Sequence, residues 1–191
     1  GVIGREYALQ SGESKQVAKA IEQHYWPLNI DSNLPESIPA VIVGLADRLD
    51  SLVGLLSVGL RPTGATDPFG QRKMALGCVQ LLLGKNLDID LRVVLEMAAQ
   101  AQPVRTEGVV EQAASFILKR LQGVLRDRGY RHDVLEAVLS VQGHNPHRAL
   151  KSIEQLTIWI AREDWSKILD SFARCVRIIP EDEELASIDY G

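Results

Sequence analysis

The sequence predicts an all-α protein, a helical bundle followed by a C-terminal helical extension. Apolar residues recur at steps of three and four almost everywhere along the 191 residues, which is the spacing that places them on one face of a helix. Alternating apolar and polar residues, the pattern of a half-buried strand, are scarce. Proline and glycine residues separate the helical segments at most of the breaks.

The first predicted helix begins at Ser11 or Glu13 and ends at Trp26, because Pro27 limits its extension. Its apolar face would be formed by residues spaced at i, i+4, i+7 and i+11. These are Val17, Ile21, His24 and Leu28.

A long helix facing the core is predicted next, from a stripe of apolar residues at alternating steps of three and four. The stripe consists of Ile42, Leu45, Leu49, Leu52 and Leu56. The segment 59–68 then breaks the pattern. A third helix is expected to start with Asp67 as its N-cap and Pro68 at its first position, and to run to about Gly84.

Five further helices follow from the same reasoning, between breaks at Pro103, Gly129, the segment 143–146 and Pro180. Their expected ranges are 90–101, 108–128, 132–139, 146–161 and 164–177. A domain boundary is predicted between residues 100 and 108. It separates a domain at 1–102 from a helical extension at 103–191, although one continuous bundle would give a similar pattern.

Composition points to a folded protein of a reducing cytosol. Hydrophobic residues make up 46% and charged residues 24% of the chain, and its two cysteines are far apart in sequence. No apolar run reaches the ~18 residues that a membrane-spanning helix needs, so no membrane association is expected. The chain lacks an initiator methionine, and we interpret it as a piece of a longer protein.

Positive and negative charges are unevenly distributed, although the net charge is −4. Residues 119–131 carry five basic residues against one acid, a local balance of +4, whereas residues 181–189 carry five acids and no base. The five basic residues are Lys119, Arg120, Arg126, Arg128 and Arg131. This segment could lie along a nucleic-acid backbone, or it could be a solvated helix face. Few aromatic residues are nearby, so stacking on single-stranded bases is not favoured.

A second candidate site is the break before the third helix, where Arg61 precedes a turn and Arg72 and Lys73 follow it. Free backbone N–H groups at the start of that helix would add partial positive charge, so the junction could accept a phosphate. The alternative is a rigid turn in which Arg72 pairs with Asp67 or another acid.

No catalytic or metal centre is predicted. His24, Asp47 and Asp50 form the one grouping that resembles a metal site, but three such ligands are an incomplete set, and His24 is better explained as a hydrogen-bonded core residue. Cys78 lies among apolar residues and is expected to be a buried small hydrophobe. Trp26, Trp159 and Trp165 are expected to be packing anchors.

Three stretches of the chain together resemble the β subunit of the two-subunit, bacterial-type glycyl-tRNA synthetase. They are Gly4–Ala8 with Ser11–Glu13, Ala20–Tyr25 with Pro27, and Leu45–Gly54 leading to Pro62–Gly64 and Asp67–Phe69 with Arg72. The third stretch is the most specific, and the likeness is weaker after about residue 92. Where the family tends to have Ser-Lys this chain has Ala65-Thr66, and Gly70 replaces the usual alanine. Arg48 and Lys73 exchange the usual Lys and Arg with retention of charge.

The resemblance implies an HD-like helical domain over 1–102, incomplete at its N-terminus, and helices over 103–191 that lead toward the anticodon-binding region. It also implies a cytoplasmic parent enzyme of α2β2 stoichiometry that attaches glycine to tRNA. Its α subunit would hold the aminoacylation site and ATP, and its β subunit would support tRNA-Gly. This segment would then be non-catalytic and hold no cofactor. The alternatives are a structural scaffold or α-subunit-contacting module without RNA contact, and a metal phosphohydrolase related to HD enzymes.

Overall fold

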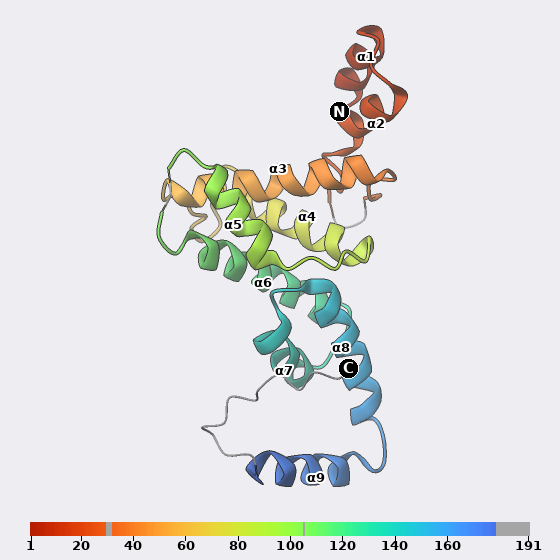
Figure 1. Ribbon diagram of the computed structural model, residues 1–191, viewed down its shortest axis with the longest axis vertical. Coiled ribbons are helices and arrows are strands. Elements are labelled where there is room, and N and C mark those ends of the chain that lie inside the picture. Colours follow the sequence, from red (N-terminus) through yellow and green to blue (C-terminus); the bar gives the residue numbers. More distant parts are fainter. Residues whose placement is uncertain (30–31, 105, 179–191) are drawn as a thin grey trace, which may run out of the picture. The chain divides into compact units, whose positions relative to one another are not determined.

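A computed structural model of the protein describes residues 1–29, 32–104 and 106–178. Over these ranges the backbone forms nine helices and no strand, with one isolated bridge between Thr63 and Thr66, so the all-α prediction is confirmed (Figure 1). The helices are α1 (Val2–Gln10), α2 (Lys15–Gln23), α3 (Ile38–Ser57), α4 (Gln71–Gly84), α5 (Leu91–Ala101), α6 (Val109–Asp127), α7 (His132–Gln142), α8 (Pro146–Ile160) and α9 (Trp165–Ile178).

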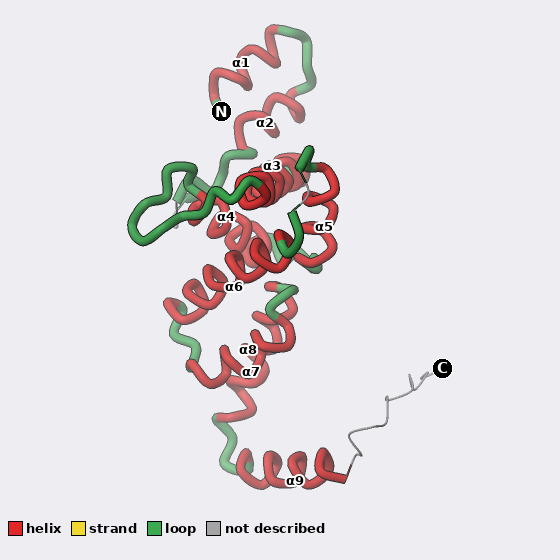
Figure 2. The backbone as a smooth tube through the Cα atoms, turned by 90° about the vertical axis from the view of Figure 1, so that its left-hand side faces the viewer, coloured by secondary structure: helices red, strands yellow, loops and turns green. Residues whose placement is uncertain are grey.

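The chain divides into two compact units, Gly1–Ile153 and the residues from Glu154 onward. In the first unit α3 is central, because it packs against α2, α4, α5 and α6. Figure 2 looks along α3 and shows α4, α5 and α6 below it, with the pair α1 and α2 on the opposite side. In the second unit no described residue of α9 is buried. None of the described helices is long and apolar enough to cross a bilayer.

Most of the predicted α3 stripe forms the core. Leu45, Leu49, Leu52 and Leu56 are all buried, and Leu52 is completely inaccessible to solvent. Ile42 is the exception, with 61% of its surface exposed. It continues the stripe in sequence, but it lies on an open groove between α3 and α5.

The first predicted helix, if it begins at Glu13, agrees with α2 to within about three residues, but its buried face was wrong. The chain forms α1 first, and α2 begins after Ser14, whose hydroxyl accepts a hydrogen bond from the Val17 amide at 3.2 Å. Val17 and Leu28 are exposed. The buried residues of α2 are the small Ala18 and Ala20 together with Gln23, because α2 is packed closely between α1 and α3.

The predicted start of the third helix, at Asp67 and Pro68, was also wrong. The helix begins at Gln71, after Gly70, whose positive φ of 67° is a conformation that favours glycine. Asp67 nevertheless stabilises the helix start, since its carboxylate accepts hydrogen bonds from the amides of Gln71 and Arg72, each at 2.9 Å. Asp67 therefore caps the helix from the turn that precedes it.

The later helices agree with their predicted ranges to within about three residues. The first of them beyond the predicted boundary, α6, packs on α3, α4 and α5, and the compact unit continues to Ile153. The division into 1–102 and 103–191 stays a prediction about the parent protein. Of the three tryptophans, Trp26 and Trp165 are half-buried, whereas Trp159 is exposed. The acidic segment 181–189 lies outside the described residues.

Candidate functional site

Two of the groups that were expected to bind a phosphate at the turn before α4, the amides at the helix start and the Arg72 guanidinium, already have partners within that turn. Asp67 occupies two amides at the helix start. The Arg72 guanidinium donates a hydrogen bond of 2.5 Å to the carbonyl of Gly64, so it braces the turn instead of pairing with a carboxylate. Lys73 is exposed on α4. This geometry favours the rigid-turn interpretation for Asp67 and Arg72.

Arg61 points away from that turn and toward α6. Its Nη2 atom donates to Oε1 of Gln112 at 2.6 Å, and it lines a hollow of about 390 Å³ together with Glu111, Phe116 and Lys119 of α6. The neighbouring Arg120 guanidinium lies 4.7 Å from the centre of the Phe116 ring, a distance at which a cation is attracted to an aromatic face. Two candidate sites that are far apart in sequence therefore meet on one surface.

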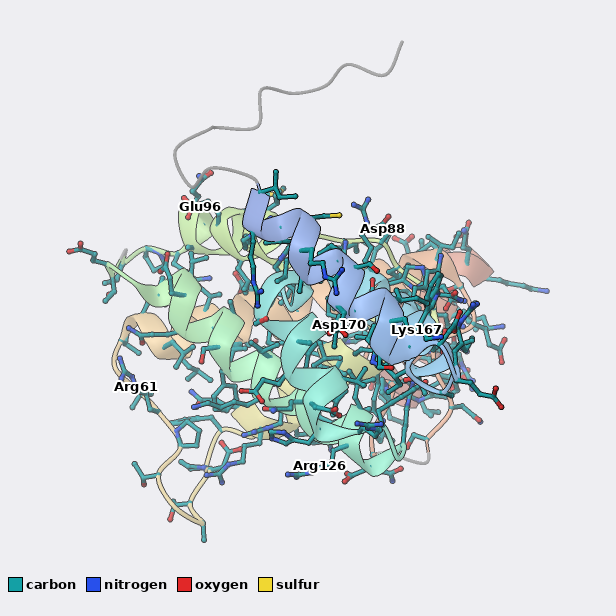
Figure 3. All side chains as sticks on the ribbon, turned by 90° about the horizontal axis from the view of Figure 1, so that it is seen from below. Arg61, Asp88, Glu96, Arg126, Lys167 and Asp170 are labelled. Carbon is teal, nitrogen blue, oxygen red and sulfur yellow. The ribbon has the colours of Figure 1, made fainter. Side chains whose placement is uncertain are left out.

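The rest of α6 extends this surface. Arg126 follows Lys119 by seven residues, which is two helical turns and roughly 10 Å on the same face. Both side chains are exposed, and no ion pair joins either to a described carboxylate. Figure 3 shows Arg61 and Arg126 along the lower part of the view. We call Arg61, Lys119, Arg120 and Arg126 the α6 basic row.

The two remaining cations of the segment differ from each other. Arg128 is the C-cap of α6 and is exposed. Arg131 lies beyond the helix and forms a two-bond ion pair with Asp133, at 3.1 and 2.6 Å. These hydrogen bonds raise the pKa of Arg131 and lower the pKa of Asp133. Arg131 is therefore less available than the α6 basic row for an external anion.

Sequence reasoning missed the role of Arg48, which is only 7% exposed. Its Nη1 donates to the carbonyls of His24 (2.9 Å) and Gly44 (2.7 Å), and its Nη2 donates to those of Tyr25 (2.7 Å) and Trp26 (3.1 Å). Burial lowers the pKa of the Arg48 guanidinium. Arg48 thus binds the end of α2 to α3.

The glycine that faces Arg48 shows how closely the helices approach. A Cβ atom on Gly77 of α4 would lie 2.4 Å from Nε of Arg48, which is nearer than real Cβ atoms come to other atoms. Cys78, the next residue, is completely buried, and burial raises the pKa of its thiol to about 12. Cys78 is a packing residue, as predicted, and this part of the chain serves the fold.

The incomplete metal grouping remains incomplete. Nδ1 of the half-buried His24 lies 2.9 Å from the carbonyl of Ile21 in its own helix. Oδ1 of Asp50 accepts a 2.6 Å hydrogen bond from Gln102, and Asp47 is exposed. Within the described ranges no three His, Cys, Asp or Glu side chains come together as metal ligands do.

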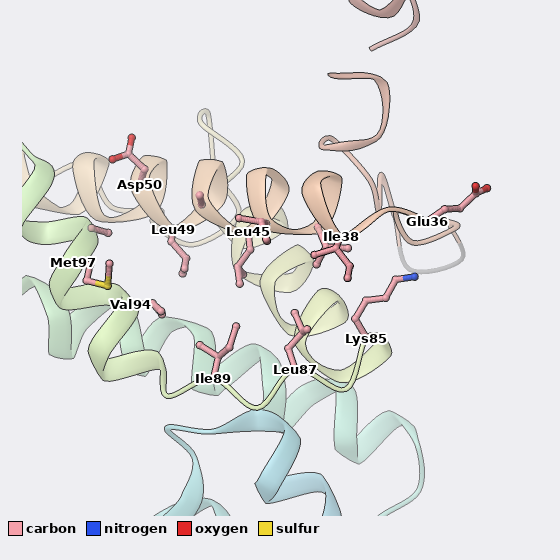
Figure 4. Close-up of a pocket in the computed structure, with 14 residues that line it drawn as sticks. Glu36, Ile38, Leu45, Leu49, Asp50, Lys85, Leu87, Ile89, Val94 and Met97 are labelled. Carbon is pink, nitrogen blue, oxygen red and sulfur yellow. The ribbon is translucent and has the colours of Figure 1, made fainter. Parts of the chain in front are cut away.

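A groove of about 680 Å³ between α3 and α5 is the second feature that the sequence reasoning did not locate (Figure 4). Its walls are almost entirely apolar. They comprise Ile38, Val41, Ile42, Leu45, Ala46 and Leu49 of α3, Leu87 and Ile89 of the loop before α5, and Val94, Met97 and Ala98 of α5. Glu36, Lys85 and Asp50 complete the lining. The available signal in the sequence was the run of apolar residues at 40–43, which is wider than one helix face.

These features define an all-α module with a row of cations formed by α6 and by Arg61 of the segment before α4, an apolar groove between α3 and α5 and a buried arginine that fixes the helix connections. Comparison with known proteins makes the assignment specific. A family model described as glycyl-tRNA synthetase beta subunit matches residues 1–140. The chain belongs to that family.

Individual relatives extend the match beyond residue 140. The glycine–tRNA ligase beta subunit of Sulfurihydrogenibium sp. is 33% identical over 191 residues, covering 100% of this chain and 26% of the relative. That of Moorella thermoacetica is 34% identical, covering 96% and 28%. The chloroplastic/mitochondrial glycine–tRNA ligase 2 of Arabidopsis thaliana is 34% identical, covering 94% and 17%. The chain spans about a quarter of the length of its bacterial relatives.

Proposed function

We propose that this chain is a non-catalytic, tRNA-supporting segment of a cytoplasmic glycyl-tRNA synthetase, and that its α6 basic row meets phosphate groups of tRNA-Gly. The parent enzyme would use ATP to attach glycine to tRNA. Its α subunit would hold the site that binds glycine and ATP. The observation that carries the proposal is the convergence of Arg61 and Lys119 on one hollow, with Arg126 on the same face of α6.

The proposed contact is electrostatic. Each cation that meets a phosphate releases condensed counterions, so binding weakens as salt increases, with a slope of about 0.7 to 0.9 per contact. Four cations at most contribute here, and the chain as a whole carries a net charge of −4. Affinity should therefore be weak and strongly salt-dependent. Such a surface supports and orients a tRNA that other parts of the synthetase hold more tightly.

Binding of the chain to tRNA-Gly and to an unrelated tRNA over a salt series tests the proposal. Replacing Lys119 and Arg126 by alanine removes two phosphate contacts and should lower the salt slope by about 1 to 2. A matched control replaces Lys15 of α2 and Lys151 of α8, two exposed lysines that do not belong to the row, and changes net charge by the same amount. Equal weakening by both double variants would show a non-specific charge effect and contradict a defined surface.

A second function is favoured by the α3–α5 groove. Its apolar lining suits a scaffold or a module that contacts the α subunit, in which case the basic row would have no RNA partner. Absence of salt-sensitive tRNA binding by the folded chain at low salt would support this alternative. The same outcome would contradict the proposed RNA contact.

A further inference from the structure

The α3–α5 groove exposes large apolar side chains side by side. Ile38, Ile42 and Met97 are 74%, 61% and 64% exposed, and all three line the groove (Figure 4). Single exposed apolar residues are common on protein surfaces, but contiguous ones mark a surface that another group covers. Val93, on the same helix as Met97 and 58% exposed, does not line the groove and provides an internal comparison.

The lining excludes polar occupants. Asp50 is engaged by Gln102, and Glu36 forms an ion pair with Lys19. The hydrogen bond from Lys19 lowers the pKa of Glu36, and the charge of Lys85, which faces Glu36 at the same end of the groove in Figure 4, lowers it further. Between these ends the walls offer no charged group, so a nucleic acid or a charged metabolite would lose its hydration without compensation.

The walls also determine what kind of segment fits. Both α3 and α5 are helices whose central backbone groups are hydrogen-bonded within the helix, so an added strand would find no partner for its own backbone. A helix satisfies its backbone internally and can lay an apolar face into such a groove. The α3 wall from Ile38 to Leu49 extends over roughly 16 Å. That length matches about three turns of an incoming helix.

We propose that a helix of the parent β-subunit polypeptide, from outside residues 1–191, packs into the α3–α5 groove through a face of apolar residues. The inference rests on family membership and does not depend on RNA contact by the α6 basic row. The bacterial relatives are about four times as long as the matched segment, which covers 26% and 28% of two of them. A nearly uniform apolar lining is typical of permanent contacts, whereas contacts between separable partners are more polar.

Cysteine labelling tests this arrangement without destabilising the fold. Met97→Cys is prepared in chain 1–191 and in the full-length β subunit, each with the exposed Cys175 replaced by serine. Alkylation of position 97 is followed by mass spectrometry of its peptide. We expect labelling to be at least tenfold slower in the full-length subunit than in chain 1–191. Val93→Cys, outside the groove, should be labelled at similar rates in both.

Three outcomes would overturn the proposal. Equal, fast labelling of position 97 in both proteins, with or without the α subunit, would show that the groove stays open. Protection that appears only after the α subunit is added would identify that subunit as the occupant. Protection that appears in chain 1–191 as its concentration rises would instead identify a second copy of the chain. None of these results depends on tRNA binding, so failure of the RNA proposal remains distinguishable.

Discussion

Positive charge serves different purposes around Arg48 and along α6. The Arg48 guanidinium is buried and donates to backbone carbonyls of two segments, whereas Lys119 and Arg126 are exposed and point to the surface without an ion pair in the described part of the chain. The first cation fixes the fold, and the others are available to a partner. The acceptors around a cation, and its burial, decide which role it has.

Arg148 is intermediate between the buried Arg48 and the cations of the α6 basic row. Arg148 at the start of α8 forms three hydrogen bonds of 2.8 to 3.0 Å with Asp88, and Asn145 donates to the same carboxylate at 2.6 Å. The ion pair is exposed, with 67% of the Arg148 side chain and 48% of the Asp88 side chain accessible, and it ties α8 to the loop before α5. The stabilising effect of a cation should therefore decrease from Arg48 through Arg148 to the α6 basic row.

Arg48→Met should have the largest effect. Removing the guanidinium takes a donor from one buried and three part-buried carbonyls, and an unsatisfied buried group costs about 1–3 kcal/mol. We expect the free energy of unfolding to fall by about 3 kcal/mol or more, as measured by urea denaturation. Arg48→Lys should retain part of the stability, because an ammonium group can supply three donors. It is also the exchange suggested by the family resemblance.

The comparison would break if Arg48→Met were tolerated. A loss of about 0.5 kcal/mol or less, the range of an ordinary surface substitution, would mean that the carbonyls of Tyr25 and Trp26 find water instead. A Lys119→Ala and Arg126→Ala double variant provides the reference. Its unfolding free energy should stay within about 0.5 kcal/mol of the unmodified chain.

The second largest effect should be a loss of stability in acid, as the carboxylates that pair with Arg148 and Arg92 are protonated. Hydrogen bonds from Arg148 and Asn145 lower the pKa of Asp88, and those from Arg92 lower the pKa of Asp90 to about 2. Because these folded-state pKa values lie below the unfolded value of about 3.9, the stabilisation is complete above that pH and is lost as the pH falls toward 2. Thermal unfolding followed from pH 5 to pH 2 measures the loss.

Asp88→Asn separates the two carboxylates in that experiment. The variant should unfold at a lower temperature at pH 5, because Arg148 loses its charged acceptor, and its melting temperature should fall less steeply as acid is added. A variant curve parallel to that of the unmodified chain would assign the acid sensitivity elsewhere. Raised salt should reduce the difference, since the pair is exposed.

The local sequence pattern predicted the positions of most helices but not which helices pack together. The α3 stripe and the range of α5, predicted as 90–101, depend on neighbours in sequence, and both were found. The buried face of α2, the open position of Ile42 and the carbonyls around Arg48 depend on which helices pack together. Nothing in the spacing of apolar residues specifies that packing.

The candidate site shows the same limit. The basic residues of segment 119–131 were identifiable from composition, and Arg61 from its place before a turn. That Arg61 contacts Gln112 of α6 while Arg72 turns back to Gly64 follows from the path of the segment 59–70, which a single sequence does not reveal. The Asp67 carboxylate, at the position expected for a phosphate, was predicted both as a helix N-cap and as a possible partner of Arg72, and the capping role is the one that the structure shows.

The smallest expected effect concerns Gly123, between Lys119 and Arg126 on α6. A Cβ atom there would meet no neighbour within 4 Å, in contrast to Gly77 beside Arg48. Gly123→Ala should therefore raise the free energy of unfolding by about 0.5–1 kcal/mol through helix propensity alone. A lower stability in urea denaturation would contradict the open surface that the structure gives to this part of α6.

The same variant measures how closely RNA approaches the helix. Its charge is unchanged, so the salt slope of tRNA binding should be unchanged as well. Weaker tRNA binding by the more stable Gly123→Ala variant would place the phosphate backbone against Gly123 itself. The variant differs from the unmodified chain only by one methyl group, which would then obstruct the RNA. Unchanged binding would assign the contact to the ends of Lys119 and Arg126, whose long side chains can hold a phosphate away from the helix surface.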